Sequence, residues 1–214
     1  MDQSNLEQSN SEQANQESHL EQRVIELFHQ SIEATMSCGE AVATPLTLAA
    51  QQMNNSLLND GKLLLCGSST SASIAEIAST HLAHRFEQER PGLPAICLHH
   101  DSGTQVALST EPASGGLFAK PLRTLAHPGD ALLIISGGGS PPSLVETIRT
   151  AHDINVNLIV MTALGDENLR ALLTADDLEI HLPIERKSRL LEVQLLAINS
   201  LCDLLDFQLF GGDF

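Results

Sequence analysis

Hydroxyl side chains that could bind an anion such as phosphate follow two apolar runs of this sequence. The first run, Leu63–Leu65, leads through Gly67 into a turn of serines and a threonine, and the second, Ala131–Ile135, leads into three consecutive glycines. The candidate ligands are Ser68, Ser69, Thr70, Ser71, Ser136 and Ser140. N–H groups at the start of a helix bind anions, and hydroxyls in the turn before it add donors. The same hydroxyls also cap helices, so each residue taken alone has a structural alternative.

The elements that must position these turns are short apolar strands that alternate with helices. The predicted strands are 63–65, 95–98, 131–136, 156–161 and 178–182, and the predicted helices that follow them are 70–86, 117–126, 142–152, 167–173 and 187–209, with 102–116 as a loop. This alternation predicts an α/β fold, a doubly wound five-stranded parallel sheet flanked by helices. Ligands of such sheets bind at the carboxyl ends of the strands. Both turns follow strands, so we expect them to converge on one anion site.

The two ends of the chain differ in composition from this alternating centre. Residues 1–19 are rich in Gln, Asn, Ser and Glu and predict a disordered tail, which leaves 20–214 as one domain. Residues 20–58 have a helical pattern that Gly39 and Pro45 are expected to break into two long helices. The last helix is apolar on most of its faces, which predicts that it is buried on several sides and favours a subunit interface.

The charge of the chain restricts the kinds of partner it can bind. Its 214 residues carry a formal net charge of −16. Direct binding to nucleic acid needs lysines and arginines for the phosphates, so this charge argues against it. An acidic surface suits a basic protein partner, although solubility alone also explains it.

The cysteines and the apolar runs indicate a cellular compartment. Cys38, Cys66, Cys97 and Cys202 are far apart in sequence and form no CxxC pair, which predicts free buried thiols in a reducing environment. We find no pattern of a signal peptide and no apolar run long enough to span a bilayer. The expected location is the cytoplasm.

Metal and nucleotide sites have little support in the sequence. His81 and His84 share a predicted helix face, and His99 and His100 end a strand, but no cysteine or carboxylate cluster stands beside them at metal spacing. The first turn lacks both the Lys-Ser/Thr ending of a Walker loop and the spaced glycines of a dinucleotide fingerprint. We therefore expect no metal and no cofactor.

Several fragments resemble the sugar isomerase (SIS) domain family over roughly residues 20–210. The fragments are Cys66-Gly67 with Thr70-Ser71, Arg85-Phe86, Glu89-Arg90-Pro91, Leu93-Pro94-Ala95-Ile96, Gly129-Asp130, Ser136 with Gly139, and Arg189 with Glu192. Within the family they are most similar to the phosphoheptose isomerases and to the non-catalytic DnaA initiator-associating proteins. The ending 199–206, followed by Leu209 and Phe210, resembles the second group closely.

The isomerase side of this resemblance implies a metal-dependent aldose–ketose conversion with a carboxylate and a histidine as acid and base. The four positions that hold the metal in such enzymes align with Ile77, His81, Leu191 and Asn199. Ile77 and Leu191 cannot ligate a metal or move a proton, and Asn199 cannot act as a base, so the resemblance implies no catalytic residue here. Pro141 also stands where the family has a phosphate-binding serine, and the hydroxyls of the two turns are interpreted as a vestigial phosphosugar site.

The other side of the resemblance implies a binding module. It implies a homotetramer that uses Leu209 and Phe210 to bind DnaA and promotes initiation of chromosome replication through several copies of one weak site. Packing of this apolar pair against its own subunit is the structural alternative. Two other functions remain as alternatives, a phosphoheptose isomerase acting on sedoheptulose 7-phosphate and a sugar-phosphate sensor.

Overall fold

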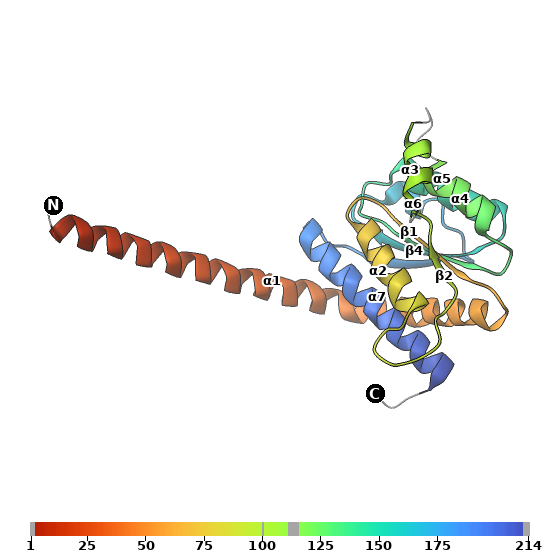
Figure 1. The fold of residues 1–214 in the computed structure, drawn as a ribbon, viewed down its shortest axis with the longest axis horizontal. Coiled ribbons are helices and arrows are strands. Elements are labelled where there is room, and N and C mark those ends of the chain that lie inside the picture. The colour runs from red at the N-terminus through yellow and green to blue at the C-terminus, as the bar shows by residue number, and fades with distance from the viewer. Residues whose placement is uncertain (1–2, 100, 111–115, 212–214) are drawn as a thin grey trace.

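A five-stranded parallel sheet forms the centre of the computed structural model, which describes residues 3–99, 101–110 and 116–211 (Figure 1). Its strands are β1 (Leu63–Gly67), β2 (Ala95–Cys97), β3 (Ala131–Ile135), β4 (Asn157–Ala163) and β5 (Leu178–Leu182). Their order is β2-β1-β3-β4-β5 and every neighbouring pair is parallel. The predicted fold class and five-stranded sheet are therefore confirmed.

Helices cover both faces of the sheet. They are α1 (Gln3–Leu58), α2 (Ser71–Ala83), α3 (Ser102–Ser109), α4 (Gly116–Leu125), α5 (Pro142–Asp153), α6 (Glu167–Arg170) and α7 (Lys187–Phe210). Because side chains alternate along a strand, Leu63 and Leu65 join one core with α1, α2 and α7, while Leu64 and Cys66 join a second core with α4 and α5. A sheet buried on both faces explains why β1 and β3 are apolar along their whole length, whereas the edge strand β5 carries Glu179 and His181 between its apolar residues.

The first helix corrects one expectation. Gly39 and Pro45 do not divide it, because α1 is continuous from Gln3 to Leu58 with Pro45 inside it. Proline in a helix removes one hydrogen bond and costs about 3 kcal/mol. Apolar contacts offset that cost here, since a buried stripe passes both residues and packs against the sheet and α7. The stripe is Cys38, Val42, Leu46, Ala49, Ala50 and Met53.

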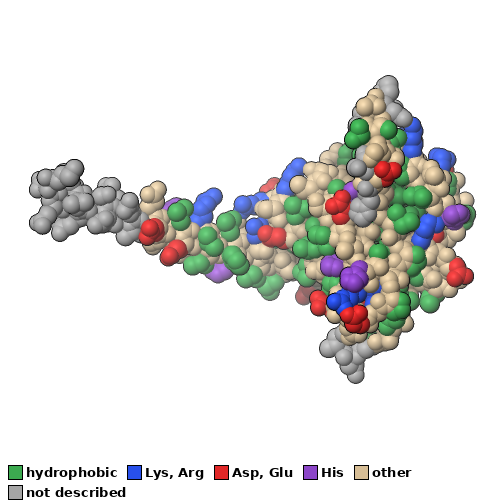
Figure 2. Space-filling view, viewed as in Figure 1, with side chains coloured by type: hydrophobic (Ala, Val, Ile, Leu, Met, Phe, Trp, Pro, Cys, Tyr) green, Lys and Arg blue, Asp and Glu red, His purple; other side chains and the backbone are tan. Residues whose placement is uncertain are grey.

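The amino-terminal part of α1 projects away from the domain (Figure 1). Large apolar side chains on this part are exposed, and Figure 2 shows apolar groups along the projecting helix. They are Leu20, Val24, Ile25, Phe28, Ile32 and Met36. The helix includes residues 3–19, and the domain boundary at residue 20 stays a prediction.

The segment between β2 and α4 holds a helix that the sequence pattern missed. α3 begins after Asp101, whose carboxylate accepts hydrogen bonds from the N–H groups of Gly103 and Thr104 and so caps the helix. The sequence pattern predicts a loop over 102–116, because small polar residues surround a short apolar stretch. None of the described helices is long and apolar enough to cross a membrane.

Candidate functional site

The two hydroxyl-bearing turns leave neighbouring strands at the same edge of the sheet. β1 lies beside β3, and Gly67 at the end of β1 is paired with Ile135 at the end of β3. The strand order reverses direction between these two strands, which is where α/β sheets of this kind bind ligands. The predicted convergence of the two turns is therefore present in the backbone.

The first turn is tied to the second by a hydrogen bond. Ser68 is buried, and its Oγ accepts a bond of 2.9 Å from the N–H of Gly137. Ser69 and Thr70 are exposed, and Ser69 has a positive φ of 53°. Thr70 precedes α2 but its side chain makes no capping hydrogen bond. One of the four first-turn candidates therefore holds the two turns together, and two face solvent.

Ser71, the fourth candidate, is fully buried and faces α7. Its Oγ donates a hydrogen bond of 2.7 Å to Oε1 of Gln194, and Nε2 of Gln194 donates one of 2.7 Å to the carbonyl of Ser136. Gln194 is also fully buried. The sequence analysis did not select Gln194, although an amide within an otherwise apolar stretch of helix was the available signal. The glutamine amide thus joins the Ser71 hydroxyl to the carbonyl of Ser136, and this hydroxyl is already bonded within the chain.

Side-chain oxygens of the chain accept hydrogen bonds from N–H groups of the second turn. Ser136 Oγ accepts from the N–H of Gly138 at 3.1 Å, and the N–H of Ser140 donates to the carboxylate of Asp166 at 2.8 Å. Asp166 is fully buried and accepts a second bond, from the N–H of Ala163. Ser140 Oγ donates to the carbonyl of Gly165 at 3.3 Å. A carboxylate bound to this turn repels a second anion, so the turn is a poorer phosphate site than its hydroxyls suggest.

The close packing of the second turn also restricts its shape. Gly138 has a φ of +87°, and a Cβ there would come within 2.8 Å of the carbonyl oxygen of Leu164. Glycine is therefore required at this position by both its backbone conformation and its neighbours.

The four positions aligned with metal ligands lie on α2 and α7, which pack against each other. The ring of His81 contacts that of Phe86 edge-on, with centroids 5.2 Å apart. Asn199 Oδ1 is buried and has no hydrogen-bond partner in the described part of the chain. Ile77 and Leu191 supply only hydrocarbon. Residues 3–99, 101–110 and 116–211 contain no group of three His, Cys, Asp or Glu side chains that could hold a metal ion.

A carboxylate–histidine pair that the sequence analysis missed lies at the end of β2. Glu76 Oε1 is 3.2 Å from Nε2 of His99, whose side chain is 9% exposed, and Cys97 Sγ is 3.4 Å from the same ring. Burial raises the pKa of the Cys97 thiol to about 11, so this sulfur is protonated and a weak nucleophile at neutral pH. His100, the other histidine noted here, lies outside the described residues.

The carboxyl end of α7 is held by a buried arginine. Arg90 Nε donates to Asp206 Oδ1 at 2.6 Å, and the side chains are 3% and 6% exposed. The other guanidinium nitrogens donate to the carbonyls of His81 and Leu82 at the end of α2. Burial and the charge of Asp203 raise the pKa of Asp206, outweighing the opposite effect of Arg90. A buried pair of this kind positions groups more than it stabilises the fold.

The predicted partner residues lie beside this ion pair. The guanidinium carbon of Arg90 is 5.9 Å from the centroid of the Phe210 ring, close enough for a cation–π contact. Phe210 remains 46% exposed, whereas Leu209 is half-buried. A crevice of about 100 Å³ lies between Phe210 and residues 88–91. The structure therefore brings Phe210 to the surface more fully than Leu209.

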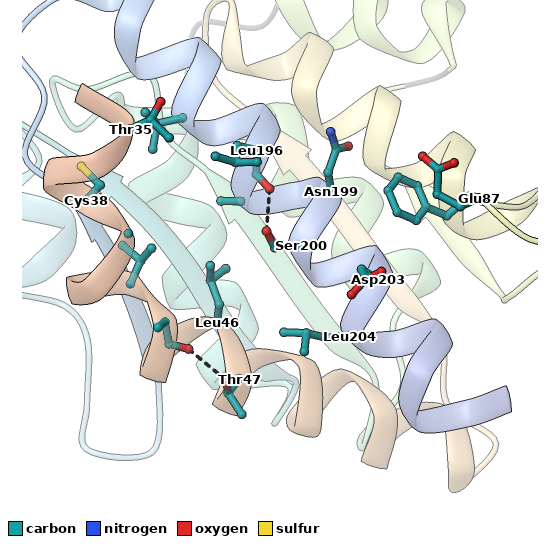
Figure 3. Close-up of a pocket in the computed structure, with 16 residues that line it drawn as sticks. Thr35, Cys38, Leu46, Thr47, Glu87, Leu196, Asn199, Ser200, Asp203 and Leu204 are labelled. Atoms are coloured by element: carbon teal, nitrogen blue, oxygen red, sulfur yellow. Dashed lines mark hydrogen bonds between the residues drawn. The ribbon is translucent and has the colours of Figure 1, made fainter. Parts of the chain in front are cut away.

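A larger groove of about 620 Å³ lies between α1 and α7 (Figure 3). Cys38 and Leu46 of α1 line one side, and Leu196, Asn199 and Leu204 of α7 line the other. Leu196 is 47% exposed. The apolar walls suit a protein segment better than a charged sugar phosphate.

Comparisons with known proteins find relatives of two kinds. The SIS domain family model matches residues 27–163. A phosphoheptose isomerase from Chromohalobacter salexigens is 38% identical over 192 residues, which cover 90% of this chain and 98% of that protein. The DnaA initiator-associating protein DiaA of Shigella flexneri serotype 5b is 35% identical over 191 residues, which cover 89% of this chain and 97% of that protein.

A solved structure supports the same relationship. A phosphoheptose isomerase from Francisella tularensis has a TM-score of 0.82 to this chain at 31% identity, covering 86% of this chain and 97% of that one. Isomerases and initiator-associating proteins are thus similar to the chain at nearly equal identity, 38% and 35%. Overall similarity therefore does not favour either kind, and the residues at the sites carry the distinction between an isomerase and an initiator-associating protein.

Proposed function

This chain belongs to the SIS domain family, and we propose that it is a non-catalytic member, an adaptor that binds the initiator DnaA and promotes initiation of chromosome replication. The observation that carries the proposal is the pairing of α2 and α7. Of the four aligned metal positions on these helices, Ile77 and Leu191 offer no ligand atom and Asn199 offers no base. His81 alone cannot supply both the acid and the base of an isomerisation.

The state of the two turns supports a non-catalytic role. Four of the six candidate hydroxyls, Ser68, Ser71, Ser136 and Ser140, make hydrogen bonds within the chain. A phosphate would have to displace these bonds and approach the carboxylate of Asp166. Phosphate binding would break these hydrogen bonds within the protein, and the bonds to the phosphate would have to compensate for their loss. We therefore interpret the turns as a vestigial phosphosugar site that now supports the sheet edge.

The end of α7 supports the role of a binding module. Phe210 is exposed beside the anchored Arg90–Asp206 pair, and aromatic side chains of this kind are common anchors at protein interfaces. The DiaA relatives carry DnaA association in their name. Leu209 and Phe210 are the residues that we assign to this contact.

Self-association would multiply this contact. The exposed apolar side chains on the projecting part of α1 form a surface that a second copy of the chain can cover. A homotetramer would present four copies of the Phe210 surface and raise the local concentration of DnaA by multivalency. DNA would be bound by DnaA, since the adaptor carries a net charge of −16.

A phosphoheptose isomerase is the alternative, and one observation favours it beyond sequence similarity. Glu76 and His99 form a carboxylate–histidine pair at the carboxyl edge of the sheet, near the first turn. Such a pair can transfer protons, so an isomerase would have to use these residues in place of the aligned positions. A sugar-phosphate sensor would use the same turns without turnover.

The deciding experiment combines a binding assay with an activity assay on the full chain. We expect purified DnaA to bind immobilised wild-type protein and to lose at least about tenfold in affinity to the Leu209→Ala/Phe210→Ala variant. Leu125→Ala, an exposed leucine at the end of α4, is the matched control and should bind normally. Turnover of sedoheptulose 7-phosphate by the wild-type protein, abolished in Glu76→Gln, would instead establish the isomerase.

A further inference from the structure

The last turn of α7 exposes two aromatic side chains rather than one. Phe207 is 53% exposed and Phe210 is 46% exposed. Residues three apart on a helix lie on the same face, with their Cβ atoms about 5–6 Å apart. We propose that Phe207 and Phe210 together form the docking surface for a segment of DnaA, an inference that rests on the proposed function. This segment carries an apolar side chain flanked by basic residues. Leu209 then contributes less than Phe207.

The exposure of this pair does not follow from the composition of the chain. The chain has six phenylalanines and neither Trp nor Tyr. Within the α/β domain, Phe118 is buried in the core and Phe86 packs against His81 and the core, whereas Phe28, on the projecting part of α1, is exposed. Phe207 and Phe210 are both exposed on the last turn of α7, and exposed aromatic side chains are common at the centre of interfaces.

Contacts within the chain restrict the end of α7 and the Phe210 ring before any partner binds. Arg90 joins the end of α2 to Asp206 in α7 and contacts the Phe210 ring. Gly211, with a φ of +65°, ends the helix directly after Phe210. A rigid anchor loses little conformational entropy on binding, so the same contact area gives a higher affinity. Arg90 is therefore a positioning residue for the aromatic pair.

The charges around the pair select a basic partner. Asp203 is exposed one turn before Phe207, and Glu89 lines the crevice beside Phe210 with a side chain that is 85% exposed. Glu87 and Asp203 both line the adjoining end of the groove between α1 and α7. The nearby cations are engaged within the chain, Arg85 with Glu89 and Arg90 with Asp206. An apolar centre with an acidic rim is complementary to an apolar segment with lysine or arginine beside it.

The test compares single substitutions in the full chain, with purified DnaA as the probe. We expect Phe207→Ala to weaken binding at least about tenfold and Phe207→Trp to bind within about threefold of wild type, because an aromatic ring is retained. Leu209→Ala should cost less than Phe207→Ala, and Leu125→Ala should have no effect. Unchanged melting temperature and oligomeric state in each variant show that the loss is local.

The charge requirement has its own measurement. Asp203→Asn and Glu89→Gln should lower the association rate at low salt, and this effect should shrink at high salt because exposed charges are screened. Unchanged rates at low salt would overturn the basic character of the partner segment.

The outcomes separate this inference from the proposed function. If Phe207→Ala binds as wild type while Phe210→Ala does not, the aromatic pair is wrong and the adaptor role stands. If wild-type protein does not bind DnaA at all, the proposed function fails and the pair has lost its partner as well.

Discussion

The carboxyl edge of the sheet and the last turn of α7 are the two regions on which function was expected, and they differ in how their side chains are used. At the sheet edge, Ser68, Ser71 and Gln194 are buried and bonded to other parts of the chain. At the end of α7, Phe207 and Phe210 are exposed, and the polar pair beneath them is buried. The polar groups of the first region are hydrogen-bonded within the fold, whereas apolar groups of the second region are exposed to solvent.

This difference shows why the type of a residue does not reveal its role. Hydroxyls after a strand suggest a phosphate site, yet here they bind an amide, backbone N–H groups and a carbonyl. The apolar pattern at the end of α7 includes Phe207, which the sequence analysis did not single out, yet its side chain is more exposed than that of Phe210. Four predictions, from the largest expected effect to the smallest, test whether the two regions are as separate as this comparison holds.

The largest effect is expected from Arg90→Ala. It leaves Asp206 buried without its partner, and removing one member of a buried ion pair costs about 3–5 kcal/mol of unfolding free energy. Urea unfolding measures the loss, and Arg90→Met with Asp206→Leu is the control that should regain much of it. A loss below about 1 kcal/mol would show that the pair is solvated and does not hold α7.

Substitution of Gln194 by Leu tests the sheet edge. The change removes the partner of the Ser71 hydroxyl and of the Ser136 carbonyl, so we expect it to cost about 2 kcal/mol of unfolding free energy. DnaA binding should stay within about twofold of wild type at a temperature where the variant is folded, because the amide is remote from Phe207. A specific loss of DnaA affinity in a folded variant would join the two regions into one site.

The pH dependence of stability is expected to come from the opposite edge of the sheet. Burial alone would raise the pKa of Asp130, but hydrogen bonds from Lys62 and from the His127 N–H, with the Lys62 charge, lower it overall. The folded protein therefore releases this proton at a lower pH than the unfolded chain, whose Asp pKa is about 3.9. The stabilisation is present above that pH and is lost as the pH falls through the folded pKa.

Asp130→Asn measures this contribution. We expect this substitution to lower the unfolding free energy by about 1.5 kcal/mol at pH 7. When the pH falls below about 4, the unfolding free energy of the variant should decrease less than that of the wild type. Equal acid sensitivity of the two proteins would assign the titration to other carboxylates.

The smallest effect is expected from removal of residues 2–19. A Gln- and Ser-rich segment has little apolar surface to bury, so the deletion should change the unfolding free energy by no more than about 0.5 kcal/mol. DnaA affinity should also stay unchanged, because Phe207 and Phe210 belong to the far end of the domain. A smaller oligomer after the deletion would show that residues 2–19 take part in assembly, which would place the domain boundary before residue 20.

Local patterns were sufficient for the sheet. The five predicted runs became strands within two residues of their predicted ends. β1 and β3 are buried on both faces and apolar along their whole length, and the edge strand β5 alternates apolar and polar residues. Local patterns failed for α1, because Pro45 predicts a break in a helix that is in fact continuous. The apolar contacts of Cys38 to Met53 with distant parts of the chain offset the free-energy cost of a proline inside a helix.

By itself, the sequence determined the fold class and the two turns at one edge of the sheet, because these depend on the type and order of residues. Only the tertiary structure decided which polar groups are already bonded and which aromatic rings are exposed. Ser71 meets Gln194 across 123 residues, and Arg90 meets Asp206 across 116. The rotation of α7 against α1 and α2 exposes Phe207 and turns Leu209 partly inward, and that rotation is set by the summed packing of three helices rather than by any local pattern.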